Sequence, residues 1–463
     1  MTDLPPIPSE SNALPISYTV PHVIVLLKSF EMDGQQQKGF QSSADLYNWY
    51  NYLYGKCDNQ PSVFKSKTDE LVRGKSNDLD KVKAIFYWVQ DNIRYIAFED
   101  GYAGFIPQTA QEVYKNKYGD CKGMANLTTE MLKQAGLDAH MTWIGTRHLP
   151  YNYSIPSLCV DNHCISTVYV GGKPYFLDAT EKYVPLGEYA YRIQGKEALI
   201  GKGKDHEIIK VPVADKAQNK ILTQASFSLN DNVLKGHLKV TLTGEERTNF
   251  HQFYHDLATD RKKEFLQRVL EFGNDNLTAT NVKTSDLNNR EIPVVIEGDI
   301  DLSNNVIIDE KELYAGIDFF PRKLTSFMPD DKRVNPYEFN SIYVAEDEIE
   351  LKVPGFRIKD VPEAIDQQSA DYGFKGSYSQ TGSTILLKKT LSINTGTVKK
   401  ADFANWKAFL KKLKDFNNNI VTVEKDPNYV PPTEQPVKTA TTPAKPAAPV
   451  KKPVTKPAPA KKN

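Results

Sequence analysis

The spacing of apolar residues changes at Gly136, and this change constrains the fold more than any other feature of the sequence. Before Gly136, apolar side chains recur every three or four residues, as on the buried face of a helix; after it they alternate, as on a strand. The pattern predicts helices over 42–54 and 78–94, and a third that follows Tyr118-Gly119-Asp120 and ends at Gly136. It then predicts strands over 138–145, 163–170 and 175–178. Helices followed by antiparallel strands indicate an α+β fold.

The chain of 463 residues is long enough for more than one domain. We expect the α+β domain to span 41–205. Alternating segments from 221 onward predict a β-rich, sandwich-like domain over 215–425, with helices over 247–271 and 400–416. Residues 1–40 contain one strand-like stretch, 16–27, and are interpreted as the remnant of an N-terminal β domain and its linker. Residues 426–463 are rich in Pro, Ala and Lys and predict a disordered tail.

Charge and hydropathy exclude several classes of partner. Lys plus Arg and Asp plus Glu both total 58, so no global basic field draws the chain to nucleic acid or to an anionic membrane. No apolar run approaches the ~20 residues of a membrane-spanning helix, and the start of the sequence contains no recognisable signal peptide. Binding partners are therefore expected at a local site.

The cysteine pattern is not that of a disulfide scaffold. Four cysteines in a chain this long do not form a disulfide framework, and none has the CxxC spacing of a zinc or redox site. A bridge between Cys159 and Cys164 across their short loop is conceivable, but two separate thiols are favoured. Cys164 follows His163, should face the opposite side of the strand, and is expected to be structural.

Three residues, Cys121, His163 and Asp178, carry the candidate chemistry. A thiol nucleophile needs a base that takes its proton and a group that orients this base. Cys121 would begin a helix, where the positive end of the backbone dipole favours a thiolate and the free backbone N–H can hold an oxyanion. We expect Cys121 to be the nucleophile, His163 the general base and Asp178 the carboxylate that orients the base.

The pair Gly171-Gly172 predicts a tight hairpin turn between the last two strands. If the turn pairs Val170 with Lys173, the same register places His163 and Asp178 on one face of the hairpin as diagonal neighbours. The carboxylate would then be within reach of the imidazole. The register is a hypothesis that rests on the turn.

Three motifs occur in a fixed order along the chain: Tyr118-Gly119-Asp120-Cys121-Lys122 before a helix, Asn162-His163 opening a strand, and Leu177-Asp178-Ala179-Thr180 ending the next. This order resembles the transglutaminase-like superfamily of the papain-like fold. The upstream stretch 89–95 and Pro107 are similar to a bacterial group in which the core is flanked by β-rich domains of unknown function. The motifs cover about 42–205.

The resemblance implies a papain-like transglutaminase core with a Cys-His-Asp triad, and it implies no metal and no organic cofactor. It also implies an extracytoplasmic, periplasmic location, although no signal peptide stands in this sequence. Two features depart from the group. Gly123 follows Lys122 where the group usually has an acid, and the N-terminal domain that usually precedes the core is reduced to residues 1–40.

Other histidines and one aspartate are further candidates for site residues. His148 and Asp161 lie in the polar loop before His163 and are expected at the surface. His251 and His255 are four residues apart on a predicted helix, but no third ligand is visible, so a structural role is favoured over zinc binding.

Aromatic and amide residues near the motifs are further candidates. Trp143 and Tyr118 are expected either to line a cleft or to pack in the core. Gln108 and Gln111 lie upstream of Cys121 and are candidates for a second oxyanion donor.

The sequence predicts acyl transfer at an amide bond of a peptide or protein, which the resemblance associates with the cell envelope. Water as acceptor makes the protein a peptidase or amidase, and a lysine amine makes it a crosslinking transglutaminase. Hydrolysis is favoured because nothing in the sequence marks a site for a second protein amine. The alternative from another class is a non-catalytic scaffold that holds a peptide or glycan.

Overall fold

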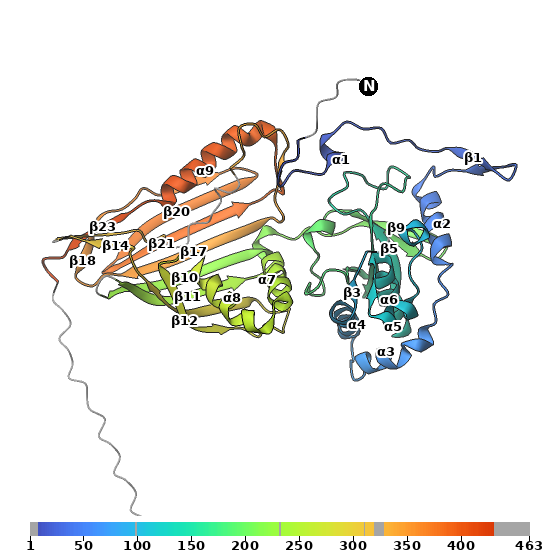
Figure 1. Ribbon diagram of the computed structural model, residues 1–463, viewed down its shortest axis with the longest axis horizontal. Helices are drawn as coiled ribbons and strands as arrows, with labels where there is room; N and C mark the ends of the chain where they lie inside the picture. The colour runs from blue at the N-terminus through green and yellow to red at the C-terminus, as the bar shows by residue number, and fades with distance from the viewer. Residues whose placement is uncertain (1–7, 98–99, 231–232, 310, 319–327, 430–463) are drawn as a thin grey trace, which may run out of the picture.

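The computed structural model describes residues 8–97, 100–230, 233–309, 311–318 and 328–429, and Figure 1 shows two lobes side by side. The first lobe (residues 43–211) has helices packed on a sheet, and the second lobe (residues 220–425) is built mainly from strands. The predicted fold class, an α+β core followed by a β-rich region, is confirmed. Most of the predicted tail, residues 430–463, lies outside the described residues.

The first lobe is centred on a five-stranded antiparallel sheet in the order β7-β6-β5-β8-β9. Its strands are β5 (Asp138–Ile144), β6 (His163–Val170), β7 (Lys173–Leu177), β8 (Glu197–Lys202) and β9 (Asp205–Lys210). The first three are the predicted strands, with ends that differ by at most two residues. The order places β6 between its hairpin partner β7 and the strand β5.

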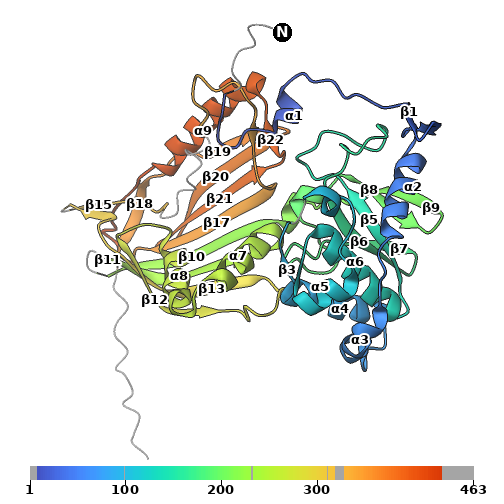
Figure 2. The same ribbon diagram turned by 45° about the vertical axis from the view of Figure 1, so that its right-hand side comes forward.

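Helix α6 (Cys121–Gln134) lies against β5 and β6 on one side and against neighbouring helices on the other (Figure 2). The other helices of this lobe are α2 (Ser43–Tyr54), α3 (Lys65–Val72), α4 (Asp78–Asn92) and α5 (Ala110–Asn116). The apolar stripe of α6 is at most 1% exposed and consists of Met124, Leu127, Met131 and Leu132. The predicted helix signals are confirmed, because Ser42 caps α2 and Gly136 follows α6 with a φ of 80°.

The second lobe contains an eight-stranded sheet in the order β12-β13-β11-β10-β17-β21-β20-β19. Its strands are β10 (Lys220–Asn230), β11 (Val233–Leu242), β12 (Leu277–Thr284), β13 (Val294–Leu302), β17 (Tyr343–Lys352), β19 (Ile365–Gln368), β20 (Tyr372–Thr381) and β21 (Thr384–Ile393). A four-stranded sheet joins the same core and consists of β14 (Val306–Ile308), β15 (Glu312–Ala315), β18 (Phe356–Asp360) and β23 (Val421–Lys425). Helix α9 (Phe403–Asn417) covers the large sheet and buries Trp406 completely.

The single helix predicted over 247–271 is wrong. The structure has two helices, α7 (Gly244–Asp256) and α8 (Thr259–Glu271), because Leu257 and Ala258 between them have extended backbones. Asp260 lies in the first turn of α8, where an acid favours a new helix start. The continuous apolar spacing hid this second start.

The strand predicted over 16–27 is also wrong. Residues 16–19 form the short helix α1 (Ile16–Thr19), and strands appear only later, as the hairpin β1 (Ser29–Met32) and β2 (Gln35–Lys38). Pro15 and Pro21 flank α1, and a proline lacks the backbone N–H that a sheet needs. Val23 remains 87% exposed, so the apolar stretch that suggested a strand has no partner sheet among the described residues.

The N-terminal segment nevertheless connects the two lobes. Arg333 of the second lobe donates to the backbone carbonyls of Ser11 and Asn12 at 2.7 and 3.0 Å. A few residues later, the Tyr18 hydroxyl donates to the backbone carbonyl of Arg147 in the first lobe at 2.8 Å. Figure 1 shows this segment running from the upper edge of the second lobe, through α1, and above the first lobe to β1.

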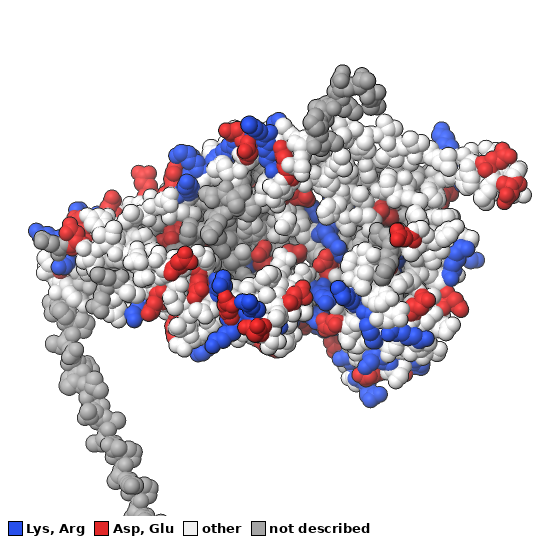
Figure 3. Space-filling view, viewed as in Figure 1, with Lys and Arg blue, Asp and Glu red and all other residues white. Residues whose placement is uncertain are grey.

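The surface carries both signs of charge. Figure 3 shows lysine and arginine interspersed with aspartate and glutamate over both lobes, in keeping with the balanced composition. Within the described ranges, no helix combines the length and the apolar character that crossing a bilayer requires.

Candidate active site

Cys121 is the first residue of α6, as the sequence predicted. The Asp120 side chain caps this helix by accepting the Gly123 backbone N–H at 2.7 Å. Just before it, β4 (Tyr118–Gly119) pairs in parallel with β3 (Arg94–Tyr95) and fixes the path of the chain. The sulfur is thereby held at the positive end of a buried helix.

Gly123 is closely packed by its surroundings. A Cβ atom at this position would lie 2.9 Å from the Gln108 side-chain oxygen and 3.0 Å from the Val113 side chain. Close packing of α5 and the preceding loop against α6 therefore explains why this chain has glycine where the similar group usually has an acid.

The predicted hairpin register is confirmed. Val170 pairs with Lys173, and both glycines of the turn have positive φ. At the far end of the hairpin, His163 Nε2 lies 2.9 Å from Asp178 Oδ2, and both side chains are about 5% exposed or less. The imidazole and the carboxylate thus form a buried hydrogen-bonded pair.

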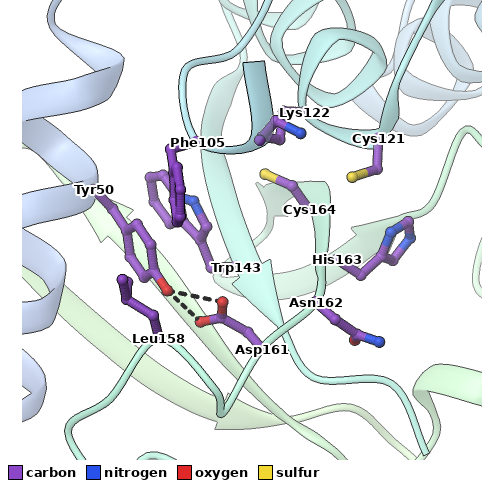
Figure 4. Close-up of a pocket in the computed structure, with 11 residues that line it drawn as sticks. Tyr50, Phe105, Cys121, Lys122, Trp143, Leu158, Asp161, Asn162, His163 and Cys164 are labelled. Atoms are coloured by element: carbon purple, nitrogen blue, oxygen red, sulfur yellow. Dashed lines mark hydrogen bonds between the residues drawn. The ribbon is translucent and has the colours of Figure 1, made fainter. Parts of the chain in front are cut away.

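His163 lies beside Cys121 in Figure 4. Burial by itself lowers the pKa of His163, but the charge and hydrogen bond of Asp178, together with the neighbouring Cys121, raise it to about 9. Burial would raise the pKa of Asp178, but His163, the Arg192 charge and the Thr180 hydrogen bond hold it well below its usual range. The pair therefore favours imidazolium and carboxylate.

Arg192 is a site residue that sequence reasoning missed. Its Nη2 atom lies 2.7 Å from Asp178 Oδ2 and 2.6 Å from Thr180 Oγ1, and its Nε lies 2.9 Å from Glu181 Oε1. It lies in a three-residue 3-10 helix, Tyr191–Ile193, within the long connection after β7, and so short a helix has no periodic pattern that the sequence could reveal. Arg192 acts on Asp178 and is a positioning residue in this arrangement.

Comparison with known proteins decides the family of this lobe. Residues 65–179 match the family model of the transglutaminase-like superfamily. These residues form a transglutaminase-like domain. Residues 313–423 match a domain of unknown function with solved structures, DUF3858, which lies in the second lobe.

A solved structure shares the fold over most of this chain. It is a candidate protease from Parabacteroides distasonis, with 13% sequence identity and a TM-score of 0.50 over 88% of this chain. The match spans 64% of that protein. A candidate cysteine protease from Cytophaga hutchinsonii has 20% identity over 29% of this chain and 42% of its own, at a TM-score of 0.22 that carries no structural argument. The comparison with curated proteins gives no match.

A cavity of about 160 Å³ opens beside Cys121 and His163 in the transglutaminase-like domain. Its walls include aromatic side chains from three elements (Figure 4): Tyr50, Phe105 and Trp143. Trp143 is 7% exposed and also belongs to the core, so both roles expected for it are observed. Tyr118 is partly buried and is not among the residues that line this cavity.

One prediction about the neighbours of His163 is wrong. Asp161 is partly buried in the cavity wall rather than at the surface, because hydroxyls of Tyr50 and Tyr153 bind its carboxylate. Cys164, predicted on the strand face opposite His163, packs in the cluster with Cys121 and Ala125 and also lines the same cavity as Cys121. The reason is that α6 packs on the face of β6 that Cys164 occupies. Its structural role stays a prediction.

The Lys122 ammonium contributes positive charge next to Cys121. It is 7% exposed and forms an ion pair with the Asp120 carboxylate. Burial by itself lowers the pKa of Lys122, but Cys121 and Asp120 raise it above its ordinary value. Lys122 therefore places a buried positive charge beside the cavity.

The two glutamine candidates have different surroundings. Gln111 accepts from the Gln60 backbone N–H at 2.9 Å and donates to the Asp58 carbonyl at 2.8 Å, so its amide is already bound away from the cavity. The Gln108 side-chain oxygen accepts from the Asp120 backbone N–H at 3.3 Å, at the start of α6. Of the two, Gln108 is the one beside the nucleophile.

The remaining cysteines and histidines lie in structural settings. All four cysteines are free, so the favoured separate thiols at 159 and 164 are confirmed. His148 is exposed, as expected. His255 stacks on Tyr183 at 4.7 Å and lies 2.9 Å from the Leu287 carbonyl. Among the described residues no group of three or more His, Cys, Asp or Glu is arranged to hold a metal ion.

Proposed function

We propose that this protein is a cysteine hydrolase of amide bonds, with Cys121 as nucleophile, His163 as general base and Asp178 as the orienting carboxylate. The proposal rests mainly on one observation: the buried 2.9 Å bond between His163 and Asp178 lies beside Cys121 at the edge of a cavity. The match of residues 65–179 to the transglutaminase-like superfamily also supports a cysteine-dependent enzyme.

The chemistry follows from these positions. Asp178 engages Nε2 of His163, which leaves Nδ1 for the Cys121 thiol. His163 takes the Cys121 proton before the attack, which gives the imidazolium that Asp178 stabilises. The thiolate then attacks the carbonyl carbon, and the C–N bond breaks as His163 gives that proton to the leaving amine. Water adds to the thioester with His163 again as base, releasing the acid and restoring the thiol.

Charge on the tetrahedral intermediate would be held by the start of α6. The backbone N–H of Cys121 is at the helix N-terminus, where donors are available and the dipole is positive. Lys122 adds a charge from the same turn. Arg192 does not reach the sulfur in this scheme but keeps Asp178 ionised and oriented.

Hydrolysis is preferred to amine transfer for two reasons. The cavity of about 160 Å³ accommodates water and one small substrate group, whereas crosslinking requires a second protein to reach the thioester. The Parabacteroides relative is described as a candidate protease, in agreement with hydrolysis. A peptide or protein is therefore the proposed substrate.

Thiol labelling tests the nucleophile. Iodoacetamide near neutral pH should alkylate Cys121 first, because burial and nearby glutamates raise the pKa of Cys57 to about 11 and burial raises that of Cys164 well above its ordinary value. Peptide mapping by mass spectrometry gives the order. Cys57→Ala is the matched control and should keep the fast phase that Cys121→Ala removes. Uniform slow labelling of all four thiols would favour the scaffold.

Product analysis separates hydrolysis from crosslinking. Wild-type protein, a glutamine-bearing protein and a dansylated amine should yield free acid or cut peptide without fluorescent conjugate. A fluorescent conjugate that depends on Cys121 would assign the protein as a transglutaminase instead.

A further inference from the structure

The wall of the cavity carries one carboxylate that the proposed mechanism does not use. Asp161 belongs to the loop between β5 and β6 and lines the same cavity as Cys121. In the view of Figure 4, Asp161 and Lys122 lie on opposite sides of the cavity, with Cys121 and His163 along its edge. The cavity therefore has an acidic side chain on one side and a basic side chain on the other.

The Asp161 carboxylate is held in place by hydroxyl groups. Tyr50 donates to Oδ1 and Oδ2 at 2.8 and 2.9 Å, and Tyr153 donates to Oδ2 at 3.0 Å. Oδ1 thus shares one bifurcated donor and keeps acceptor capacity. These contacts orient the carboxylate without neutralising it, because a tyrosine hydroxyl carries no charge.

Asp161 has no protein cation as partner within the described residues. The other acid of this pocket region, Asp120, is paired with Lys122, but no lysine, arginine or histidine forms an ion pair with Asp161. Burial raises the pKa of Asp161 to about 7, while the two tyrosine hydrogen bonds lower it. A buried carboxylate of this kind gains most from a cation supplied by a ligand.

The neighbouring walls suit a small cation. The Tyr50 ring stacks on Trp143 with centroids 4.8 Å apart and planes 7° from parallel, and Phe105 adds another aromatic wall. Aromatic faces attract ammonium groups electrostatically. The cavity volume of about 160 Å³ limits the bound group to roughly one small amino-acid residue.

We propose that Asp161, held by Tyr50 and Tyr153, is a subsite for a primary ammonium group of the substrate, next to the amide that Cys121 attacks. The substrate class is then a short peptide whose free amino group lies close to the scissile bond. The inference rests on the proposed function, because it concerns the substrate of the same site. N-acylated peptides of the same sequence are poor substrates.

Alkylation of Cys121 tests the subsite without a known substrate. Alanine chloromethyl ketone, which has a free amine, is compared with its N-acetyl derivative: the sulfur displaces chloride, and its proton passes to His163. With rates normalised to glutathione, the free-amine reagent should label Cys121 at least about tenfold faster, the factor expected for one charge-assisted hydrogen bond. Asp161→Asn should reduce this ratio to about one.

Control variants isolate the charge of Asp161. Asp161→Glu keeps the charge and should keep a ratio above that of Asp161→Asn. Asp205→Asn, at a carboxylate whose side chain is 89% exposed, should leave the ratio unchanged. Asp205→Asn should also keep the wild-type iodoacetamide rate at Cys121, and the circular dichroism spectrum of Asp161→Asn should match that of wild type, which verifies its fold.

The outcomes separate the two proposals. If iodoacetamide does not single out Cys121, the proposed function and the subsite both fall. If iodoacetamide does label Cys121 first but the two ketones react equally with wild type, only the subsite is overturned. The subsite is also overturned if Asp161→Asn folds and keeps the wild-type ratio of the two ketone rates. Asp161 would then only link α2 to the loop through its hydrogen bond with Tyr50.

Discussion

Each lobe contains a cluster of basic and acidic side chains, and the two clusters differ in how far they are exposed to solvent. In the first lobe, the Arg192 cluster (His163, Asp178, Arg192) lies beside a cavity, and the arginine side chain remains 32% exposed. In the second lobe, the Lys389 cluster (Lys389, Asp318, Asp347) is at most 3% exposed, with the lysine Nζ 2.5 and 3.4 Å from the two carboxylates.

This difference indicates that the burial of charged side chains is not enough to identify a reactive site. Both clusters hold ionised groups away from water, which costs free energy unless the charges are matched. The Arg192 cluster adds an imidazole that can exchange a proton and a neighbouring thiol that can use it. In the Lys389 cluster, Lys389 comes from β21 and Asp347 from β17, and Asn417 of α9 also approaches the lysine. Among the residues that the structure describes, no imidazole or thiol is paired with this cluster. We therefore expect mutations to separate activity from stability between the lobes.

Asp178→Asn should have the largest effect on activity. An amide cannot hold His163 in the required tautomer or stabilise the imidazolium, so kcat should fall by roughly 10³- to 10⁴-fold. Steady-state kinetics on a cleaved peptide, with circular dichroism to verify folding, provide the measurement. Asp205→Asn serves as the exposed control and should match wild type. A loss of less than threefold in Asp178→Asn would remove Asp178 from the mechanism.

Lys389→Met should have the largest effect on stability. It removes the Lys389 ammonium from beside the two buried carboxylates Asp318 and Asp347, and the free energy of unfolding of the second lobe should fall by about 3–5 kcal/mol. Hydrogen exchange of peptides from β21 measures it. Lys411→Met, which breaks an exposed i,i+4 pair on α9, should change stability by less than about 0.5 kcal/mol. An unchanged exchange rate in Lys389→Met would contradict the comparison.

The stability contributed by His163 should depend on pH. Its folded pKa of about 9 exceeds the ordinary value near 6.5, so this stabilisation is complete below pH 6.5 and is lost as pH rises through 9. The difference in unfolding free energy between wild type and His163→Gln should shrink by up to about 3 kcal/mol across that window. Denaturant titrations at pH 6 and 9.5 measure the difference.

Lys389→Met in the second lobe is the control for the pH dependence of His163→Gln. The Lys389 cluster contains no imidazole, so the destabilisation by Lys389→Met should be nearly equal at pH 6 and at pH 9. A pH-independent effect of His163→Gln would show that the imidazolium does not stabilise the fold.

Arg192→Gln should have the smallest effect of the set. Asp178 keeps His163 and Thr180 but loses the guanidinium, so kcat should fall about tenfold with little change in KM. The pKa of Asp178 should rise, which shifts the acidic limb of the pH–rate profile to higher pH. Arg192→Lys restores the charge and should recover part of both effects. An unmoved acidic limb would assign Arg192 a purely structural role.

Local sequence signals predicted the frame of the site correctly. Ser42 and Gly136 marked helix ends, and the Gly171-Gly172 turn set the register that brings His163 to Asp178. Such signals work because caps and tight turns act over a few residues. They failed at residues 257 and 258, where apolar spacing ran across a helix break.

The sequence by itself determined that a cysteine begins α6. It also determined that a histidine opens the first strand of one hairpin and that an aspartate follows the second strand. Only the tertiary structure decided that Arg192 binds Asp178 and that Asp161 turns into the cavity. Both residues lie in long connections between strands, 178–196 with its short 3-10 helix Tyr191–Ile193 and 145–162, whose course depends on long-range contacts and not on local periodicity. The same cause turned Cys164 toward the site: α6 packs on its side of β6, and strand alternation cannot say which face a helix will cover.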